Sequence, residues 1–372
     1  MIKYDKQLSV KDTATLVNSI SSEAGIENTP LCADSASLKK IGDIVTADDS
    51  GSHKFHDVLY GKIAKQVILS FSHTNRFKEF KKGMMEIGDV IEFLKPKDFV
   101  GKALPAIANR TGEYVDAPER HNDIAQYAAV NLKAYYKETL DIEELKTAFT
   151  SMSNFSSYYN AKVANMYTMY EYDEELTFQY LLLKIASGVT PVELEYGSTN
   201  KDMLATVKAT VRKACNKPSK AYNPRGALWK SNINDIIIFA EVDTLTDTEV
   251  NDLAAAFNID KMAIQSRIID LNAFTLTDDE VTRLKAIGVM GAQETAPEVD
   301  DLKYLIVDKQ GIQVYDKLLT SKVRENEEGH FYNNFLHWQA SYAWVNWATF
   351  VAITVDSTEP EPDPGDGDGD GE

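Results

Sequence analysis

The most constraining feature of this sequence is the stretch between Gly112 and Gly188, which contains no glycine and only one proline, Pro118. In its second half, apolar side chains recur at spacings of three and four: Phe155, Tyr158, Tyr159, Val163, Met166, Tyr167, Tyr170, Leu176, Tyr180 and Leu183. This spacing places them on one face of an α-helix. We predict one long helix at about 150–187, lying on a sheet, with two shorter helices broken near Glu171–Glu175 as the alternative.

The part of the chain before this helix predicts an arm and an extended excursion. Residues 9–25 begin with a serine suited to cap a helix and end at Gly25, so a short helix is expected there. Residues 26–54 show no clear period and predict an extended arm or loop. Apolar residues partly alternate between glycines at 71–97, and 129–140 can supply a returning strand, which together predict a long two-stranded excursion.

Beyond Gly188 the sequence predicts alternating strands and helices. Strands are expected at 235–241, on either side of Asp308–Gly311 within 304–319, and in the aromatic segment 331–355. Two helices are expected after the capping boxes Thr246 with Glu249 and Thr277 with Glu280. The segment 331–355 holds three of the four tryptophans, so it is buried either in a core or between subunits. The fold class predicted is therefore α+β.

The charge balance argues against broad binding of duplex DNA. The chain has 39 Lys and Arg against 57 Asp and Glu, a formal net charge of −18, whereas neutralising phosphates requires clustered cations. Cys32 and Cys215 match no metal or redox spacing, and the N-terminus lacks the apolar core of a signal peptide. The apolar stretch 344–355 is too short to span a bilayer. We expect a soluble protein of a reducing compartment.

No motif for catalysis, cofactor binding or metal binding is visible. Walker A, GxGxxG, GxSxG and HExxH patterns are absent, and the pair His53 and His56 has no further ligands at a metal-binding spacing. The paired carboxylates Glu143–Glu144 and Glu174–Glu175 are expected to be solvated helix faces. We therefore expect no enzyme, no cofactor and no metal, with an enzyme of distributed site as the least favoured class.

Two clusters of basic residues stand out against the acidic background. One lies at 211–230, which contains six cations and no acid and is either a solvated loop or a surface for an acidic partner, nucleic acid or a neighbouring subunit. The other lies at the root of the excursion and consists of Arg76, Lys78, Lys81 and Lys82. Such patches favour self-association between unlike surfaces. If the second contacts an acidic neighbour, replacing all four residues with Glu should block assembly and leave the monomer folded.

The order of these parts resembles the plan of tailed-phage major capsid proteins of the Hong Kong 97 type. At motif level the chain is similar to capsid proteins of small short-tailed phages, the Picovirinae type. The motifs that carry the resemblance are FKKG with a later IE (80–92), LKTAF with NF (145–155), AFN (256–258), LIVDK with VYD (305–316) and YNN with HWQ (332–339). Each is weak alone, but all five occur in the same order.

The resemblance implies a Hong Kong 97-like capsid fold with a defined division of the chain. The implied parts are an N-terminal arm (1–60), an extended excursion loop (61–140), a peripheral domain with a spine helix (141–188 and 329–356), an axial domain (189–328) with an insertion at 275–300, and a disordered acidic tail (357–372). A helix at Asp278–Ile287 is expected within the insertion. The terminal Asp366–Gly371 repeat matches the first half of a calcium loop, but lacks the residues that complete one.

The function implied is that of a major capsid protein in the virion. Pentamers and hexamers would form an icosahedral or prolate shell around double-stranded DNA, bound without sequence specificity, with a separate scaffolding protein, a portal at one vertex, no membrane, and assembly in the host bacterial cytoplasm. Another phage structural protein, a decoration or tail subunit, is the alternative. Contacts between subunits are expected at Arg76, Lys78, Lys81, Lys82, Gly83, Gly88, Arg212, Lys213, Lys217, Trp338, Trp344 and Trp347.

Overall fold

The computed structural model describes residues 10–26, 29–47, 54–55, 58–59, 75–86, 90–98, 100–101, 123–159, 162, 165–242, 267–326, 328–329 and 331–356. Gly88, His53, His56, the Thr246 capping box and the acidic tail lie outside these residues. Within the described part, no helix has the length and apolar character needed to cross a bilayer. The same residues contain no group of three or more His, Cys, Asp or Glu side chains arranged to hold a metal ion.

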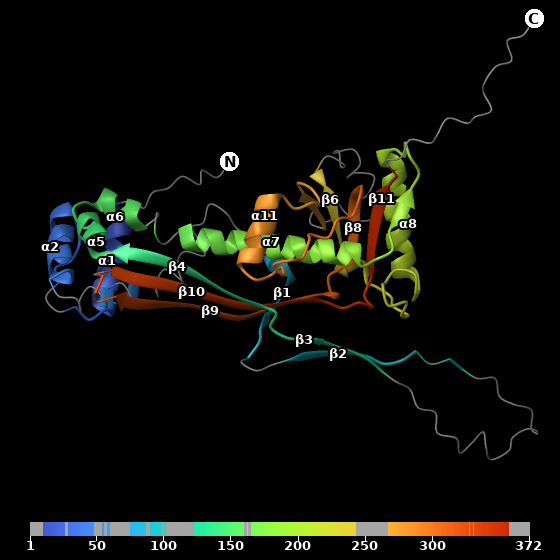
Figure 1. The fold of residues 1–372 in the computed structure, drawn as a ribbon, viewed down its shortest axis with the longest axis horizontal. Coiled ribbons are helices and arrows are strands. Elements are labelled where there is room, and N and C mark those ends of the chain that lie inside the picture. Colours follow the sequence, from blue (N-terminus) through green and yellow to red (C-terminus); the bar gives the residue numbers. More distant parts are fainter. Residues whose placement is uncertain are drawn as a thin grey trace, which may run out of the picture.

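A long four-stranded sheet and one helix form the spine of the molecule. The strands, in spatial order, are β1 (Lys81–Met84), β9 (Ile312–Asn326), β10 (Phe331–Trp344) and β4 (Leu132–Asp141). Helix α7 (Asn165–Ser187) lies along one face of this sheet (Figure 1). Strand β10 alternates between buried and half-buried residues, as a strand with one covered face does. Its Trp338 ring meets the Tyr170 ring of α7 edge-on, with centroids 5.2 Å apart.

A five-stranded sheet forms the second layer of the fold. Its strands, in spatial order, are β5 (Val192–Leu194), β11 (Phe350–Val355), β8 (Leu302–Asp308), β6 (Ile236–Glu241) and β7 (Ile268–Leu271). The apolar run of β6 is fully buried, which confirms the strand predicted at 235–241. Helix α8 (Asn200–Asn216) places Val207 and Val211 against Ile238 and Ile306 on one face of the sheet. Phe239 on the opposite face joins the main core with Phe178 of α7.

The chain passes between the two sheets three times, from β4 to β5, from β8 to β9 and from β10 to β11. The two strands predicted around Asp308–Gly311 are β8 and β9, but they lie in different sheets and do not pair with each other. The segment 331–355 likewise contains two strands, β10 and β11, one in each sheet. Strand β9 pairs with β10 from Ile312 to Asn326, so the sheet joins residues on both sides of the predicted domain boundary at 328–329. The crossing holds Gly311, where a Cβ would lie 2.6 Å from the Cβ of Ala348 and from the Phe350 ring.

The helices near the N-terminus differ in part from those that the sequence predicts. The predicted N-terminal helix is α1 (Val10–Glu23), followed by Gly25 with φ 61°. Residues 26–54, predicted as arm or loop, instead contain α2 (Ser35–Val45), which a capping box of Asp34 and Ser37 begins. Its apolar residues have helical spacing and are buried: Leu38, Ile41 and Val45. Our prediction missed this helix because the apolar stripe is short and flanked by acids and glycines.

The predicted long helix at 150–187 corresponds to two helices in the structure. They are α6 (Met152–Tyr159) and α7, and α5 (Ile142–Ala148) precedes them. Of the residues between α6 and α7, only Lys162 is described. Helix α7 continues without interruption through Glu171–Glu175, so the alternative break at that point is wrong.

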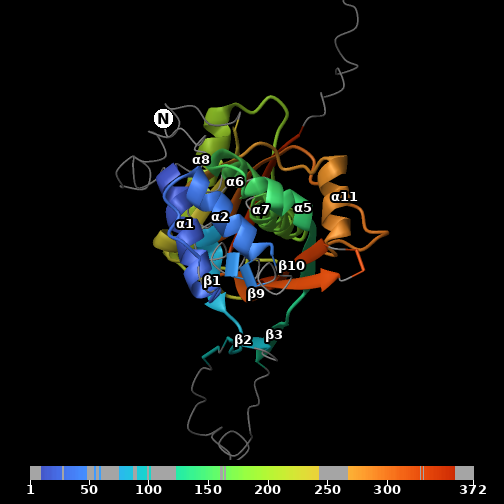
Figure 2. The same ribbon diagram turned by 90° about the vertical axis from the view of Figure 1, so that its left-hand side faces the viewer.

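The two-stranded excursion is present among the described residues, but its return strand is Ile124–Ala128 and not the predicted 129–140, most of which forms β4 of the long sheet. Strands β2 (Ile91–Lys95) and β3 (Ile124–Ala128) pair antiparallel and project away from the long sheet on the side opposite α7 (Figures 1 and 2). One face packs on the chain itself, where Phe93 and Ile124 meet Trp347 and Ala227. The other face exposes Leu94 and Tyr127, at 58% and 63%. Among the described residues, nothing therefore covers this face of the ladder.

The expected helix in the insertion is also confirmed. Helix α11 (Asp278–Ala286) begins at the Thr277–Glu280 capping box, and Gly288 follows its end with φ 78°. Leu284 of α11 and Met290 pack against Leu176 and Tyr180 of α7. Helix α11 is thus packed against α7.

Candidate assembly site: a charge network at the root of the excursion

Helix α7 buries the side chains of four acidic residues that lie within one stretch of five positions. Glu171, Asp173, Glu174 and Glu175 are each between 1% and 6% exposed. A buried charge is costly unless hydrogen-bonded and paired. The expectation that Glu174–Glu175 forms a solvated helix face is therefore wrong, and the partners of these carboxylates define a site.

The segment at the root of the excursion is anchored in the core by two phenylalanines. Phe77 and Phe80 are 1% and 0% exposed. The Phe77 ring stacks on that of Phe178 of α7 with centroids 4.5 Å apart, and the Phe80 ring lies 5.8 Å from that of Phe239. Burying a phenylalanine side chain contributes about 1.5–3 kcal/mol. This anchor places the polar residues between and around the two rings directly over the acidic turns of α7.

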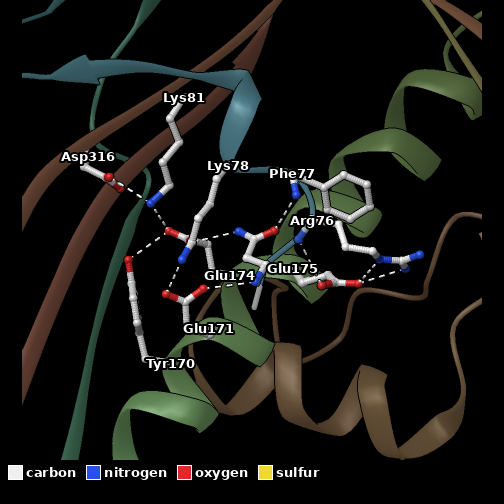
Figure 3. A network of polar contacts seen from close by, with 10 residues as sticks. Arg76, Phe77, Lys78, Lys81, Tyr170, Glu171, Glu174, Glu175 and Asp316 are labelled. Atoms are coloured by element: carbon white, nitrogen blue, oxygen red, sulfur yellow. Dashed lines mark hydrogen bonds and ion pairs between the residues drawn. The ribbon is translucent and has the colours of Figure 1, made fainter. Parts of the chain in front are cut away.

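The polar residues of this segment satisfy Glu171 and Glu174 (Figure 3). The Asn75 backbone N–H donates to Glu171 Oε2 over 3.1 Å, and its side-chain amide donates to Glu174 Oε2 over 2.7 Å. Lys78 Nζ donates to Glu171 Oε1 over 2.7 Å. The Tyr170 hydroxyl donates to Glu174 Oε1 over 2.9 Å. Each of these two carboxylates therefore receives more than one donor.

Lys81 occupies the centre of the network. Its ammonium pairs with Glu174 and also with Asp316 of β9, at 2.9 Å from Asp316 Oδ2. Burial lowers the pKa of Lys81, but the attraction of Glu174 and Asp316 exceeds this and the net pKa is raised. Burial raises the pKa of Asp316, against the opposing effect of Lys81. Lys81 is therefore a cation at neutral pH that joins β1 to both α7 and the neighbouring strand β9.

Two further ion pairs extend the network along α7. Arg76 donates from Nε and Nη2 to Glu175 Oε1, at 3.1 and 2.9 Å, and from Nη1 to the carbonyl of Asp270 in β7. Asp173 accepts from the Tyr136 hydroxyl at 2.7 Å and pairs with Arg283 of α11. The network thus ties the excursion root, both sheets and the insertion to one helix.

The structure places the predicted contact residues in different surroundings. Arg76, Lys78 and Lys81 pair with buried acids of their own chain, so replacing them with Glu would disturb the monomer, contrary to the sequence-based expectation. Lys82 is exposed and donates to the Lys309 carbonyl over 3.2 Å. Gly83 adopts φ 137°, with open space around it, at an irregularity in the pairing of β1 with β9. A side chain there would be strained.

The remaining predicted residues divide between surface and core. Arg212, Lys213 and Lys217 are exposed at the end of α8, as are the other cations of 211–230. Trp338 and Trp347 are 0% and 4% exposed, so their side chains belong to the core of one chain and not to a subunit surface. Trp344 is half-buried and meets the Phe350 ring edge-on.

The acids of the network were missed because their partners are distant in sequence. Asn75 and Arg76 lie about a hundred positions before the carboxylates that they contact, with separations of 96 and 99 residues for Asn75 to Glu171 and Arg76 to Glu175. The only available indication was a run of acids on a helix whose apolar residues cover more than one face.

Comparison with known proteins assigns the chain to a family. A family model described as the Phi29-like phage major capsid protein matches residues 16–354. The chain belongs to this family. The major capsid protein of Bacillus phage GA-1 is 24% identical over 364 residues, covering 90% of this chain and 68% of that protein. That of Bacillus phage B103 is 24% identical over 347 residues, covering 89% and 71%.

Solved structures share the fold of this Phi29-like major capsid protein. The capsid structure of Staphylococcus phage Andhra has a TM-score of 0.57 at 15% identity, covering 78% of this chain and 86% of that chain. The head structure of Helicobacter pylori bacteriophage KHP40 has a TM-score of 0.51 at 11% identity, covering 77% and 92%. The fold is therefore a phage capsid fold, and the chain is a structural component of the virion capsid.

Proposed function

We propose that this major capsid protein assembles into pentamers and hexamers that close an icosahedral or prolate shell around double-stranded DNA. The observation that carries the proposal is the combination of family membership over residues 16–354 with a projecting excursion held rigidly at its root. A projecting arm buries additional area against a neighbour, and an arm with a fixed root loses less freedom on binding. The charge network provides that fixed root.

The parts of the chain take the roles expected of a Hong Kong 97-like subunit. The long sheet and α7 form the peripheral domain, with β9 included, and the five-stranded sheet with α8 forms the axial domain. Residues 1–60 act as the N-terminal arm and the excursion overlaps a neighbouring subunit. The role of the protein is structural and not catalytic.

Assembly requires partners beyond the chain itself. We propose that these partners are a separate scaffolding protein, a portal at one vertex and DNA held without sequence specificity. Assembly takes place in the host bacterial cytoplasm. The acidic balance of the chain supports weak contact with DNA, because like charges repel.

Electron microscopy of the expressed protein tests the proposal directly. The chain is expressed with and without a scaffolding partner and the particles are imaged. Uniform closed shells or ordered arrays of capsomers are expected. A preparation that remains dispersed monomers in both conditions would contradict the proposal.

A further inference from the structure

The face of the long sheet opposite α7 carries an unusual set of side chains. Strand alternation and register place four rows there, each contributed by β4, β10 and β9 in that order. The rows are Lys133–Gln339–Leu318, Tyr135–His337–Thr320, Lys137–Phe335–Lys322 and Thr139–Asn333–Arg324. In Figures 1 and 2, none of the described helices lies over this side of the sheet, from which the β2–β3 excursion projects. We call these twelve residues the basic face.

The basic face has the opposite charge from the rest of the chain. It holds four cations and no carboxylate, although acids outnumber bases by 57 to 39 in the whole chain. Lys133, Lys137, Lys322 and Arg324 are all exposed. None of them forms an ion pair with another described residue. The face therefore presents uncompensated positive charge.

Aromatic rings lie between these cations. Tyr135 is 64% exposed, and its ring centroid lies 6.2 Å from those of Phe335 and His337. Lys137 Nζ lies 5.9 Å from the centre of the Phe335 ring. Tyrosine, phenylalanine and arginine are enriched at protein interfaces, where rigid rings bury area at low entropic cost. The composition fits a docking surface for an acidic protein.

An acidic groove lies on the other side of the same sheet. It has a volume of about 720 Å³, and Asp141, Glu143, Glu144, Tyr158 and Lys162 are among the residues that line it. Lys162 is the one cation among the described residues of the lining, and its Nζ lies 3.4 and 3.3 Å from the carboxylates of Glu138 and Glu144. Because neighbours alternate along β4, Glu138 points away from the side that Lys137 faces.

The groove also contains a polar group without a partner. Tyr158 is 9% exposed, and its hydroxyl makes no hydrogen bond with any residue that the structure describes. Burial, together with Glu144, Glu138 and Asp141, raises the pKa of this phenol. The hydroxyl thus stays protonated and its oxygen can still accept a hydrogen bond. Because the hydroxyl itself is buried, it is the excess of carboxylates lining the groove that suits a lysine or arginine side chain from outside the chain.

We infer that the basic face of one copy of this protein docks on the acidic groove of a second copy. The two surfaces have opposite charge and lie on opposite sides of one sheet, so they cannot meet within a chain. A basic face also repels itself, so the contact is heterologous, the type that closes rings. This inference rests on the proposed self-assembly of the protein and identifies the two surfaces that form the contact between copies.

Two charge-reversed variants test the contact. Variant one carries Lys137→Glu and Arg324→Glu on the face, and variant two carries Glu143→Lys and Glu144→Lys at the groove. In either variant alone, the reversed surface meets an unchanged surface of the same charge. Sedimentation should therefore show self-association at least tenfold weaker than that of the wild type. An equimolar mixture should recover association, because each reversed surface then meets an opposite one. A single chain carrying all four substitutions should recover it as well.

Matched controls separate the contact from folding and from other partners. Lys39→Glu with Lys40→Glu makes the same charge change on α2, where both lysines are exposed, and should leave association unchanged. Thermal unfolding checks each variant, and Glu143→Gln with Glu144→Gln replaces variant two if the lysines disturb α5.

The possible outcomes distinguish this contact from the proposed function. Variants that self-associate like the wild type, or a mixture that stays dissociated, would overturn the inference. Normal shells with reduced retention of DNA from variant one would assign the face to nucleic acid instead, and leave the capsid function intact. Wild-type protein that forms no shells would count against the function, while the mixing experiment would still decide the contact.

Discussion

Lys81 of strand β1 pairs with Glu174 of helix α7, and the two side chains are 20% and 1% exposed. The pair joins the first strand of the excursion root to the middle of the spine helix. Lys81 also pairs with Asp316 of β9, so the loss of this lysine would remove contacts of β1 with both α7 and β9.

Removing the cation should destabilise the folded chain. Lys81→Met leaves Glu174 buried without its charge partner, although Tyr170 and Asn75 still donate to it. Breaking a buried pair costs about 3–5 kcal/mol, and these remaining donors place the expected loss at about 3 kcal/mol. Chemical denaturation of the unassembled protein measures it. The neighbouring Lys82→Met, at an exposed residue, should change the free energy of unfolding by less than about 0.5 kcal/mol.

Removing both charges should be less harmful than removing the cation alone. In Lys81→Met with Glu174→Gln, the neutral amide no longer demands a counter-charge and can still accept from Asn75. A double-mutant cycle should give a favourable coupling of about 1–2 kcal/mol between the two positions. Strictly additive losses in the cycle would show that the two side chains do not stabilise each other.

The crossing between the sheets should not tolerate a larger residue at Gly311. Its Cβ would lie 2.6 Å from the Ala348 Cβ and from the Phe350 ring, and both residues are packed in the core, at 1% and 2% exposed. Gly311→Ala should lower the free energy of unfolding by about 1–3 kcal/mol, as overpacking does. Gly101→Ala is a suitable comparison because nothing lies near its Cβ. Equal stability of the two variants would contradict this account.

Acid should weaken the attachment of the insertion to α7. Hydrogen bonds from Tyr180, the Gly291 N–H and Lys184 lower the pKa of Glu294 from 4.5 to about 2. A carboxyl with a depressed folded-state pKa stabilises the fold above its unfolded pKa, and that stabilisation is lost as the pH falls toward the folded value. The difference in melting temperature between wild type and Glu294→Gln should therefore be constant above about pH 5.5 and shrink between about 4.5 and 2.

Glu195→Gln provides the comparison for this pH series. Glu195 is exposed and forms no ion pair among the described residues, so its replacement should give a small and nearly pH-independent difference. If the Glu294→Gln difference also showed no change with pH, the three donors would not be holding that carboxylate ionised.

Local patterns predicted individual elements well. The Thr277–Glu280 capping box begins α11 because both hydrogen bonds close within one turn. The apolar run of β6 and the alternation of β2 likewise express preferences of neighbouring residues, whereas β3 lies before the return strand predicted at 129–140. The short α2 was missed although its capping residues were present, because an apolar stripe of three residues is a weak pattern.

The candidate sites depended on residues that only folding brings together. Glu174 and Glu175 looked like a solvated pair, and their burial follows from contacts with a segment about a hundred residues earlier. The basic face combines residues of β4 with others of β9 and β10, which no local count of charges reveals.

The sequence by itself determined the α+β class, the helical character of the segment that forms α7, the outgoing strand of the excursion and the family resemblance, because each depends on short-range spacing or on motifs in order. Only the tertiary structure decided that β8 and β9 enter different sheets, that the acids of α7 are buried, and that cations gather on one sheet face. Strand partners and the burial of a charge are set by the free energy of the whole packed chain, and neighbouring residues alone do not specify it.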